Sequence, residues 1–320
     1  MSPYVIALDV GGTGMKAALI GPGPGHEPLH ETRRATPRRD GPEAVVQAVL
    51  GLAAELRAHG VERYGTEPAA VGVAVPGIVD EANGVAGYAA NLGWRDVPLR
   101  DLLRRRLASG DGHDGPPVAV GHDVRTGGLA EGRLGAGHGV DRFLFVPLGT
   151  GIAGAIGIDG RVEAGAHGSA GEIGHIVVRP GGPTCGCGRR GCLEALASAS
   201  AVGRAWAAAC GDPDATAADA AKAVASGDAR AAAVWDEAVA ALADGLVTAL
   251  TLLDPRLLIV GGGLAEAGEL LFAPLRAAVQ ERVTFQHVPS IVPAALGDAA
   301  GCLGAGLLAW DLLSAEVATR

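Results

Sequence analysis

The chain has few aromatic residues, few lysines and no long apolar run, and each shortage excludes a class of protein. Aromatic residues make up only 3% of the 320 residues, so the core must be built mainly from Ala, Val and Leu. The only lysines are Lys16 and Lys222, and the formal net charge is -9. We therefore expect no nucleic-acid partner, because binding to a phosphate backbone needs clustered cations. The longest apolar run, residues 246–253, is too short to span a bilayer, so no membrane is expected.

The cysteines and the N-terminus favour a cytoplasmic protein. Five cysteines is an odd number; three of them cluster, and Cys210 and Cys302 stand alone in apolar surroundings. The N-terminus runs directly into an apolar stretch that contains Asp9, without a basic region before it. A signal peptide is therefore not expected, and the cysteines are expected to stay reduced.

The first half of the chain predicts an α/β layer. Two apolar segments, 4–8 and 15–20, flank a glycine-rich turn and predict a β-hairpin. Further strands are expected near 31–36, 69–75 and 117–121, and helices over 42–59, over 98–107 and from Asp123. At 320 residues and 48% hydrophobic, the chain can build two medium cores.

The second half restarts with the same pattern. A strand over 142–147, a glycine turn and a returning strand over 152–158 resemble the first hairpin, with Gly12 and Gly149 separated by 137 positions. This predicts a duplicated lobe, although coincidence is the alternative in a chain with 51 glycines. Helices are then expected over residues 198–209, 215–225, 229–253 and 298–313, and a strand over 257–260.

Two glycine turns are candidates for phosphate binding. No GxxxxGK[ST] segment exists, and Lys16 lies inside a predicted strand, which excludes a Walker-type cradle. The two Gly-Thr-Gly turns would offer backbone N–H groups and Thr hydroxyls from opposite sides. Their alternative role is hairpin geometry alone. The candidates are Gly11, Gly12, Thr13 and Gly14 in the first turn and Gly149, Thr150 and Gly151 in the second.

Two aspartates stand where phosphoryl-transfer chemistry needs carboxylates. Asp9 ends a predicted strand directly before the first turn, where it would hold Mg²⁺ that bridges phosphates. Its alternative role is to bind the backbone of the turn. Asp123 lies at a strand-to-helix junction and would accept the proton of an attacking hydroxyl. Pure N-capping of the helix is the alternative for Asp123.

One histidine and three cysteines predict a zinc site. Zinc prefers four tetrahedral ligands from thiolates and imidazoles, and a filled shell is structural. Two carboxylates, Glu172 and Glu194, bracket the ligands, and the metal would fix their positions for sugar hydroxyls. The alternatives are reduced bystander cysteines or a disulfide. The four proposed ligands are His175, Cys185, Cys187 and Cys192.

These motifs together resemble the ROK family of repressors, open reading frames and sugar kinases. The resemblance rests on the stretches from Leu8 to Thr13, from Leu148 through Gly174-His175, and from Cys185 to Glu194. It implies an α/β, actin-like (ribonuclease H-like) fold of two lobes, with ATP and sugar in the cleft between them. A small lobe of residues 1–122, completed by residues 298–320, and a large lobe of residues 123–297 are expected, as is a homodimer or homotetramer. The large lobe would carry the zinc loop, residues 175–192.

The resemblance also implies a role for each site residue. Asp123 is similar to the catalytic base, and Asp9 to the acid on the magnesium side of the phosphates of ATP. The implied sugar ligands are Gly77, Asn91, His122, Glu172, His175 and Glu194. On the nucleotide side, Lys16 joins the two glycine turns, and Gly262 and Gly263 resemble the adenosine-side turn.

The expected activity is ATP-dependent phosphorylation of glucose at its 6-hydroxyl, because Asn91 to Trp94 resembles the glucokinase branch. One departure concerns the substrate: the family usually has Asn where this chain has His122, and His offers its donor and acceptor in another geometry. Fructose, mannose, N-acetylmannosamine and N-acetylglucosamine are therefore alternative substrates, and polyphosphate is an alternative donor. A sugar sensor or a transcriptional regulator is the rival class, but the first hairpin is predicted to begin at Tyr4, so a DNA-reading helix before it is not expected.

Overall fold

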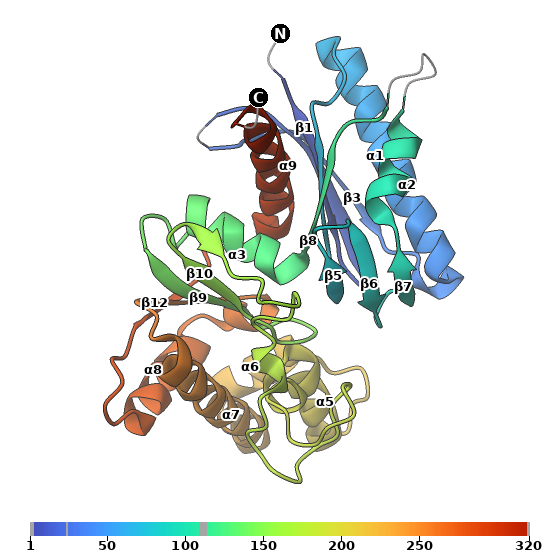
Figure 1. Ribbon diagram of the computed structural model, residues 1–320. Coiled ribbons are helices and arrows are strands. Elements are labelled where there is room, and N and C mark those ends of the chain that lie inside the picture. The colour runs from blue at the N-terminus through green and yellow to red at the C-terminus, as the bar shows by residue number, and fades with distance from the viewer. Residues whose placement is uncertain (1–2, 24, 109–113, 319–320) are drawn as a thin grey trace. The chain divides into compact units, whose positions relative to one another are not determined.

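The computed structural model describes residues 3–23, 25–108 and 114–318. The chain forms two compact units, shown in Figure 1. Unit 1 consists of Met1–Ala130, Ala164–Ser169 and Asp298–Arg320, and unit 2 of Glu131–Glu163 and Ala170–Gly297. The lobe limits expected from the sequence stay a prediction. The packing adds a short excursion, Ala164–Ser169, that leaves unit 2 and joins unit 1.

Unit 1 is built on a five-stranded sheet of order β3-β2-β1-β4-β8. The central strand β1 (Val5–Val10) pairs antiparallel with β2 (Gly14–Ile20) and parallel with β4 (Val71–Val75). An apolar run such as β1 forms a strand here because both of its faces are covered. The outer strands are β3 (Pro28–Ala35) and β8 (Val118–His122).

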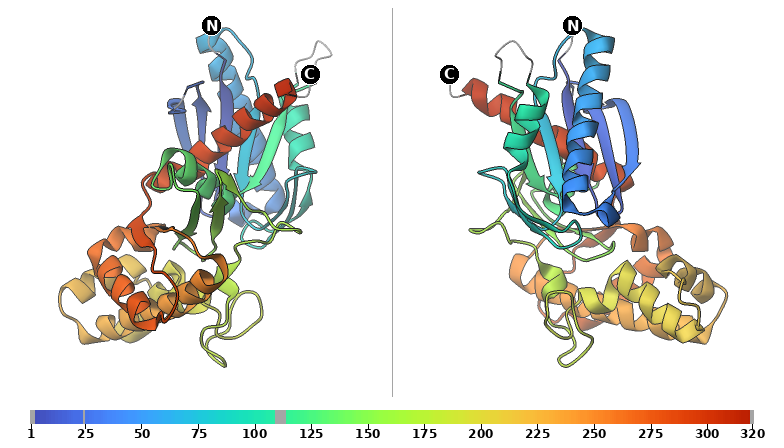
Figure 2. Two further views of the ribbon diagram at one scale, coloured as in Figure 1. Left: turned by 60° about the vertical axis from the view of Figure 1, so that its left-hand side comes forward. Right: turned by 90° about the vertical axis from the view of Figure 1, so that its right-hand side faces the viewer.

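Helices cover both faces of this sheet. In Figures 1 and 2, α1 (Pro42–Tyr64) and α2 (Leu99–Leu107) lie on one face and α9 (Ala300–Ala318) on the other. The α9 backbone approaches β4 so closely that a Cβ on Gly72 would lie 1.8 Å from the carbonyl oxygen of Ala305. By length and composition α1 also passes as a membrane span, but its apolar face packs into the core of unit 1.

A small three-stranded sheet, β5-β6-β7, follows β4 and was not expected from the sequence. Its strands are Ile78–Asp80, Val85–Ala89 and Trp94–Val97. Each is too short to show a convincing alternation of apolar and polar residues. The indole of Trp94 is buried and donates a hydrogen bond to the Pro42 carbonyl at 3.1 Å, so this sheet is fixed to the start of α1.

Unit 2 repeats the strand order of unit 1. Its sheet has the order β11-β10-β9-β12-β13, again with three antiparallel strands followed by two parallel ones. The matched central strands β1 and β9 (Arg142–Pro147) start 137 positions apart, which confirms the predicted duplication. The remaining strands are β10 (Ala155–Ile158), β11 (Arg161–Val162), β12 (Leu257–Gly261) and β13 (Ser290–Pro293).

Helices pack around the long buried helix α7 (Ala229–Leu253) in unit 2. They are α4 (Glu194–Ala197), α5 (Ala199–Cys210), α6 (Ala217–Ala225) and α8 (Glu269–Arg282). Helices α5, α6 and α7 lie within a few residues of the ranges predicted from the sequence. The helix α3 (Asp123–Leu134) begins in unit 1 and ends in unit 2, so it carries the chain from one unit to the other.

Candidate active site and metal centre

The edge of the unit 1 sheet where its parallel strands end carries several of the predicted residues. Strands β1, β4 and β8 run parallel, so their carboxyl ends meet at one edge. Asp9 lies near the end of β1, Gly77 follows β4, and Asp123 follows β8. Only glycine fits at position 77, because φ is +91° and a Cβ would lie 2.1 Å from the Tyr88 carbonyl oxygen.

The first glycine turn closes beside Asp9. The Gly11 N–H donates to the Gly14 carbonyl at 2.9 Å, which makes the turn between β1 and β2 tight. The side-chain amide nitrogen of Asn91 lies 3.1 Å from where a Cβ on Gly12 would stand. Unit 1 therefore brings Asn91, a predicted sugar ligand, next to a predicted phosphate turn.

Asp9 is a buried acid in a mixed-charge cluster. Its side chain is 16% exposed, and burial raises its pKa to about 6. The nearby Lys16 ammonium acts against that shift, and the charges of Asp123 and Asp298 add to it. The Lys16 Nζ lies 3.8 Å from the Asp9 carboxylate and donates to both the backbone carbonyl, at 2.8 Å, and the carboxylate of Asp298. Lys16 thus lies between two acids.

Asp298 was not among the site residues predicted from the sequence. Its partners Lys16 and Arg33 are on β2 and β3. Because the two ends of each pair are more than 260 residues apart in the chain, no local pattern could indicate the cluster. The two ion pairs hold the pKa of Asp298 below its ordinary value.

Asp123 opens α3 with one carboxylate oxygen already engaged. Oδ1 accepts the Val124 N–H at 2.7 Å and lies 3.4 Å from Nε2 of the buried His122. Burial raises the pKa of Asp123, while the Val124 hydrogen bond and the Arg125 charge act in the opposite direction. The side chain is still 32% exposed. A carboxylate in this state is a stronger base than a fully solvated one.

Unit 2 holds its two glycine turns together. The second predicted phosphate turn closes through a hydrogen bond from the Gly149 N–H to the Gly151 carbonyl at 3.1 Å. The Leu148 N–H donates to the Gly261 carbonyl at 2.8 Å, which joins this turn to the end of β12. At Gly262 φ is +79°, and a Cβ would lie 2.6 Å from the Leu148 backbone, so glycine is required there.

A cavity of about 590 Å³ opens beside these turns in unit 2. Two of the predicted nucleotide-binding residues, Thr150 and Gly263, line it. Helices α5 and α6 supply other parts of the lining, which the sequence did not indicate because small residues are common throughout this chain. The volume suits a small-molecule ligand such as a nucleoside. Glu266, from the 3₁₀ helix Gly263–Ala267, also lines the cavity. The residues from these two helices and the loop between them are Ala199, Ser200, Gly203, Arg204, Ala207, Pro213, Ala215, Thr216, Ala217 and Ala218.

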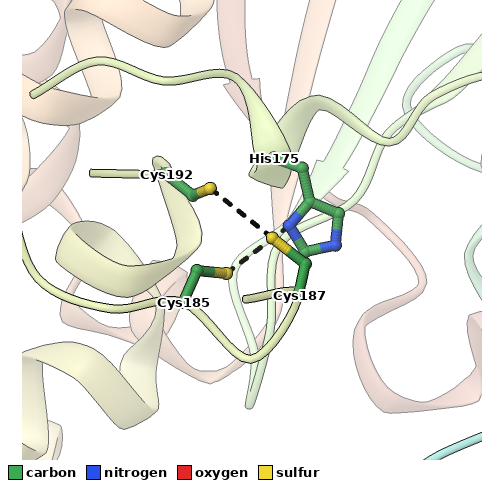
Figure 3. Close-up of side chains that lie close together, drawn as sticks. All are labelled: His175, Cys185, Cys187 and Cys192. Atoms are coloured by element: carbon green, nitrogen blue, oxygen red, sulfur yellow. Dashed lines mark hydrogen bonds between the residues drawn. The ribbon is translucent and has the colours of Figure 1, made fainter. Parts of the chain in front are cut away.

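The histidine and three cysteines of the predicted zinc site converge in unit 2 (Figure 3). Their ligand atoms lie within 4.8 Å of one another. The Cys187 and Cys192 sulfurs are 3.8 Å apart, and the Cys185 sulfur is 3.6 Å from His175 Nδ1. Tetrahedral Zn–S and Zn–N bonds of about 2.3 and 2.0 Å place two sulfurs about 3.8 Å apart and a sulfur about 3.5 Å from a nitrogen. The residues therefore fit zinc, and all five cysteines are free rather than paired in disulfides.

Two carboxylates lie against this cluster. His175 turns its second ring nitrogen, Nε2, toward the Glu172 carboxylate at 3.9 Å. Glu194 opens α4, and its carboxylate accepts the Ile152 N–H at 3.0 Å and lies 3.8 Å from the Cys185 sulfur. Unit 2 thus brings the predicted sugar ligands Glu172, His175 and Glu194 together, and Glu194 also supports the second phosphate turn.

Replacing Asp9 by Asn should make unit 1 more stable at high pH. Because burial raises its pKa, the folded chain binds more protons than the unfolded chain between pH 3.8 and about 6. Stability therefore falls as pH rises through that window and stays lower above it. We expect Asp9→Asn to raise the free energy of unfolding by about 3 kcal/mol at pH 8 and by less at pH 5. Urea denaturation at both values measures this, with the exposed Asp101→Asn as control; an Asp9→Asn variant less stable at pH 8 would contradict the expectation.

Replacing Cys187 by Ser should release the metal. Three remaining ligands bind zinc far more weakly than four, so bound zinc should fall from about one per chain to near zero. The loop between Gly171 and Glu194 should then be cleaved faster by trypsin, since it carries Arg179, Arg189 and Arg190. Elemental analysis and timed proteolysis measure both effects. Cys210→Ser, outside the cluster, is the matched control, and equal zinc in the two variants would rule out the site.

Known proteins resemble this chain along almost its whole length. The ROK family model matches residues 5–311. A glucokinase of Thermotoga maritima is 33% identical over 317 residues, which cover 94% of this chain and 95% of the relative. A ROK hexokinase from Thermus thermophilus has a TM-score of 0.82 at 32% identity and covers 98% of this chain and 99% of that one. A ROK family glucokinase from Streptomyces griseus, solved with glucose and AMPPNP, has a TM-score of 0.80 at 32% identity over 96% and 99% of the two chains. These similarities confirm the predicted two-lobed, actin-like fold, and the chain belongs to the ROK family.

Proposed function

We propose that this protein is an ATP-dependent hexose kinase that phosphorylates glucose at its 6-hydroxyl. The observation that carries the proposal is the pair of aspartates, Asp9 and Asp123, at one edge of the unit 1 sheet, both with a pKa raised by burial. Two such carboxylates suit the metal side and the base side of phosphoryl transfer. The similarity to a glucokinase solved with glucose and AMPPNP supports these two ligand classes.

In this proposal Asp123 takes the proton from the sugar hydroxyl as the phosphoryl group is transferred. Its Oδ1 is held by the Val124 N–H, so the orientation of the carboxylate is fixed. Mg²⁺ on the Asp9 side would neutralise charge on the phosphates of ATP. The two Gly-Thr-Gly turns donate backbone N–H groups to those phosphates. The cavity beside Thr150 and Gly263 takes the nucleoside.

The sugar is held by Glu172, His175 and Glu194, which the zinc cluster orients, together with Gly77, Asn91 and His122. The zinc is structural, because four protein ligands fill its coordination shell. We expect the enzyme to act in the cytoplasm, where cysteines stay reduced, as a homodimer or homotetramer. His122 carries the alternative proposal: its ring next to Asp123 favours a different hexose or an N-acyl hexosamine over glucose.

A coupled assay across a sugar panel tests the proposed function. Glucose, mannose, fructose, N-acetylmannosamine and N-acetylglucosamine are each supplied with ATP or with polyphosphate, before and after zinc removal. We expect the highest kcat/KM for glucose with ATP, and a raised KM for the sugar once zinc is removed. No turnover of any sugar with either donor would refute a kinase and favour a sugar sensor.

Replacing Asp123 by Asn should abolish phosphorylation without loss of sugar binding. Removal of a positioned base costs roughly 10²- to 10⁴-fold in kcat, while the shape of the side chain is kept. Steady-state kinetics and calorimetric titration with glucose measure the two effects separately. Asp101→Asn, an exposed acid in the first turn of α2, is the matched control. Turnover by Asp123→Asn close to that of the unmodified enzyme would show that another group is the base.

A further inference from the structure

Arg125 is a buried cation for which the proposed mechanism has no use. It lies in the first turn of α3, and only 5% of its side chain is exposed. Its Nε and one terminal nitrogen donate to the same oxygen of Glu81, at 3.1 and 2.8 Å. The other terminal nitrogen donates to the backbone carbonyl of Gly168 at 2.8 Å. One guanidinium therefore joins three separate segments of unit 1.

The Glu81 end of this connection is rigid. Arg100 on α2 donates to the backbone carbonyls of Glu81 and Ala82 at 2.8 and 2.7 Å, which fixes the turn after β5. The same Glu81 oxygen that binds Arg125 also accepts the His122 N–H at 3.4 Å. A buried guanidinium is stable only while its partners remain in place. The contacts with Glu81 therefore fix the Arg125 guanidinium independently of its hydrogen bond to Gly168.

The Gly168 end belongs to the excursion Ala164–Ser169, which leaves unit 2 after Glu163 and returns to it at Ala170. Gly168 has φ +72°, and a Cβ there would lie 3.2 Å from the Val79 carbonyl oxygen, so the segment lies close to β5. Glu172, a proposed sugar ligand, follows Gly168 by four residues. The hydrogen bond from Arg125 to Gly168 therefore restricts the position of the chain just before Glu172.

We propose that Arg125 is a positioning residue for the sugar: it docks the segment Ala164–Ser169 onto unit 1 and so sets the approach of Glu172 and His175 to the substrate. This rests on the proposed function. Arg125 binds the backbone of the segment and not the sugar itself, so it acts on affinity for the hexose rather than on the chemical step. Affinity for the nucleotide, whose cavity is built from unit 2, is independent of it.

An electrostatic role of Arg125 toward Asp123 would change other measured quantities. The Arg125 charge lowers the pKa of Asp123, against the larger effect of burial. If that were its purpose, loss of the charge would change kcat and shift its pH profile, and Arg125→Lys would restore both. A docking role predicts the opposite pattern, because a lysine ammonium keeps the charge but lacks the planar fork that reaches Glu81 and Gly168 together.

The test compares Arg125→Met and Arg125→Lys with Arg57→Met. Arg57 is a matched control in unit 1, since its Nε and a terminal nitrogen bind the carboxylate of Glu67 at 2.6 and 2.5 Å. For both Arg125 variants we expect the hexose KM and dissociation constant to rise about 10- to 100-fold, the factor for a lost charge-assisted hydrogen bond. The KM for ATP should stay within about twofold, because the docked segment is not part of the nucleotide cavity. Amide exchange in residues 164–169 should become faster in the sugar-free Arg125 variants alone.

A hexose KM within about twofold of the unmodified enzyme, or unchanged exchange in residues 164–169, would overturn the proposal. Rescue of the hexose KM by Arg125→Lys would overturn it too. If Arg125→Met does not fold, the same measurements are made on Glu81→Gln. This substitution keeps the shape of the side chain but removes the negative charge that binds Arg125. If the unmodified enzyme phosphorylates no hexose, the proposed function fails, and the exchange measurement still decides whether Arg125 docks the segment.

Discussion

The parallel pairing of β1, β4 and β8 is the constraint on which the placement of the candidate residues in unit 1 depends. Parallel strands end at a common edge, so residues that are far apart in the sequence meet where the backbone turns away from the sheet. Asp9, Gly77 and Asp123 each follow or end one of these strands. Unit 2 repeats the arrangement with β9 and β12, whose ends carry the turns at Gly149 and Gly262.

Burial raises the pKa of both aspartates at the unit 1 edge, and it does so at a cost in stability. A carboxylate removed from water is a better proton acceptor, and it also disfavours its own charged form. Lys16 partly offsets that cost for Asp9, and Arg125 does so for Asp123. Each cation is in turn held by a second acid, Asp298 or Glu81. The site is therefore a set of linked charges rather than two isolated aspartates.

The candidate residues of unit 2 around the cysteine cluster are held in another way. The stretch from Gly171 to Glu194 contains a short 3₁₀ helix, the start of α4 and two isolated β-bridges, Val177 with Cys192 and Thr184 with Arg190, so turns and bridges rather than long strands or helices hold it. A metal bound by the four clustered ligands would fix His175 in this stretch, and the adjacent Glu194 accepts the Ile152 N–H just after the second glycine turn. Glycines at sharp turns and close contacts, such as Gly262 against Leu148, let the loops approach the sheet.

Local patterns in the sequence were sufficient for the hairpins, the long helices, the duplication and the spacing of the metal ligands, because turns, periodicity and chelate loops are properties of neighbouring residues. The ROK resemblance followed from the same short motifs. Tertiary structure alone decided the pairing of Lys16 with Asp298, the docking of Gly168 by Arg125, the cavity wall of α5 and α6, and the sheet β5-β6-β7. Each of these features involves segments that are distant in the chain, or strands too short to show an alternation of apolar and polar residues. Its geometry therefore forms only when the cores pack.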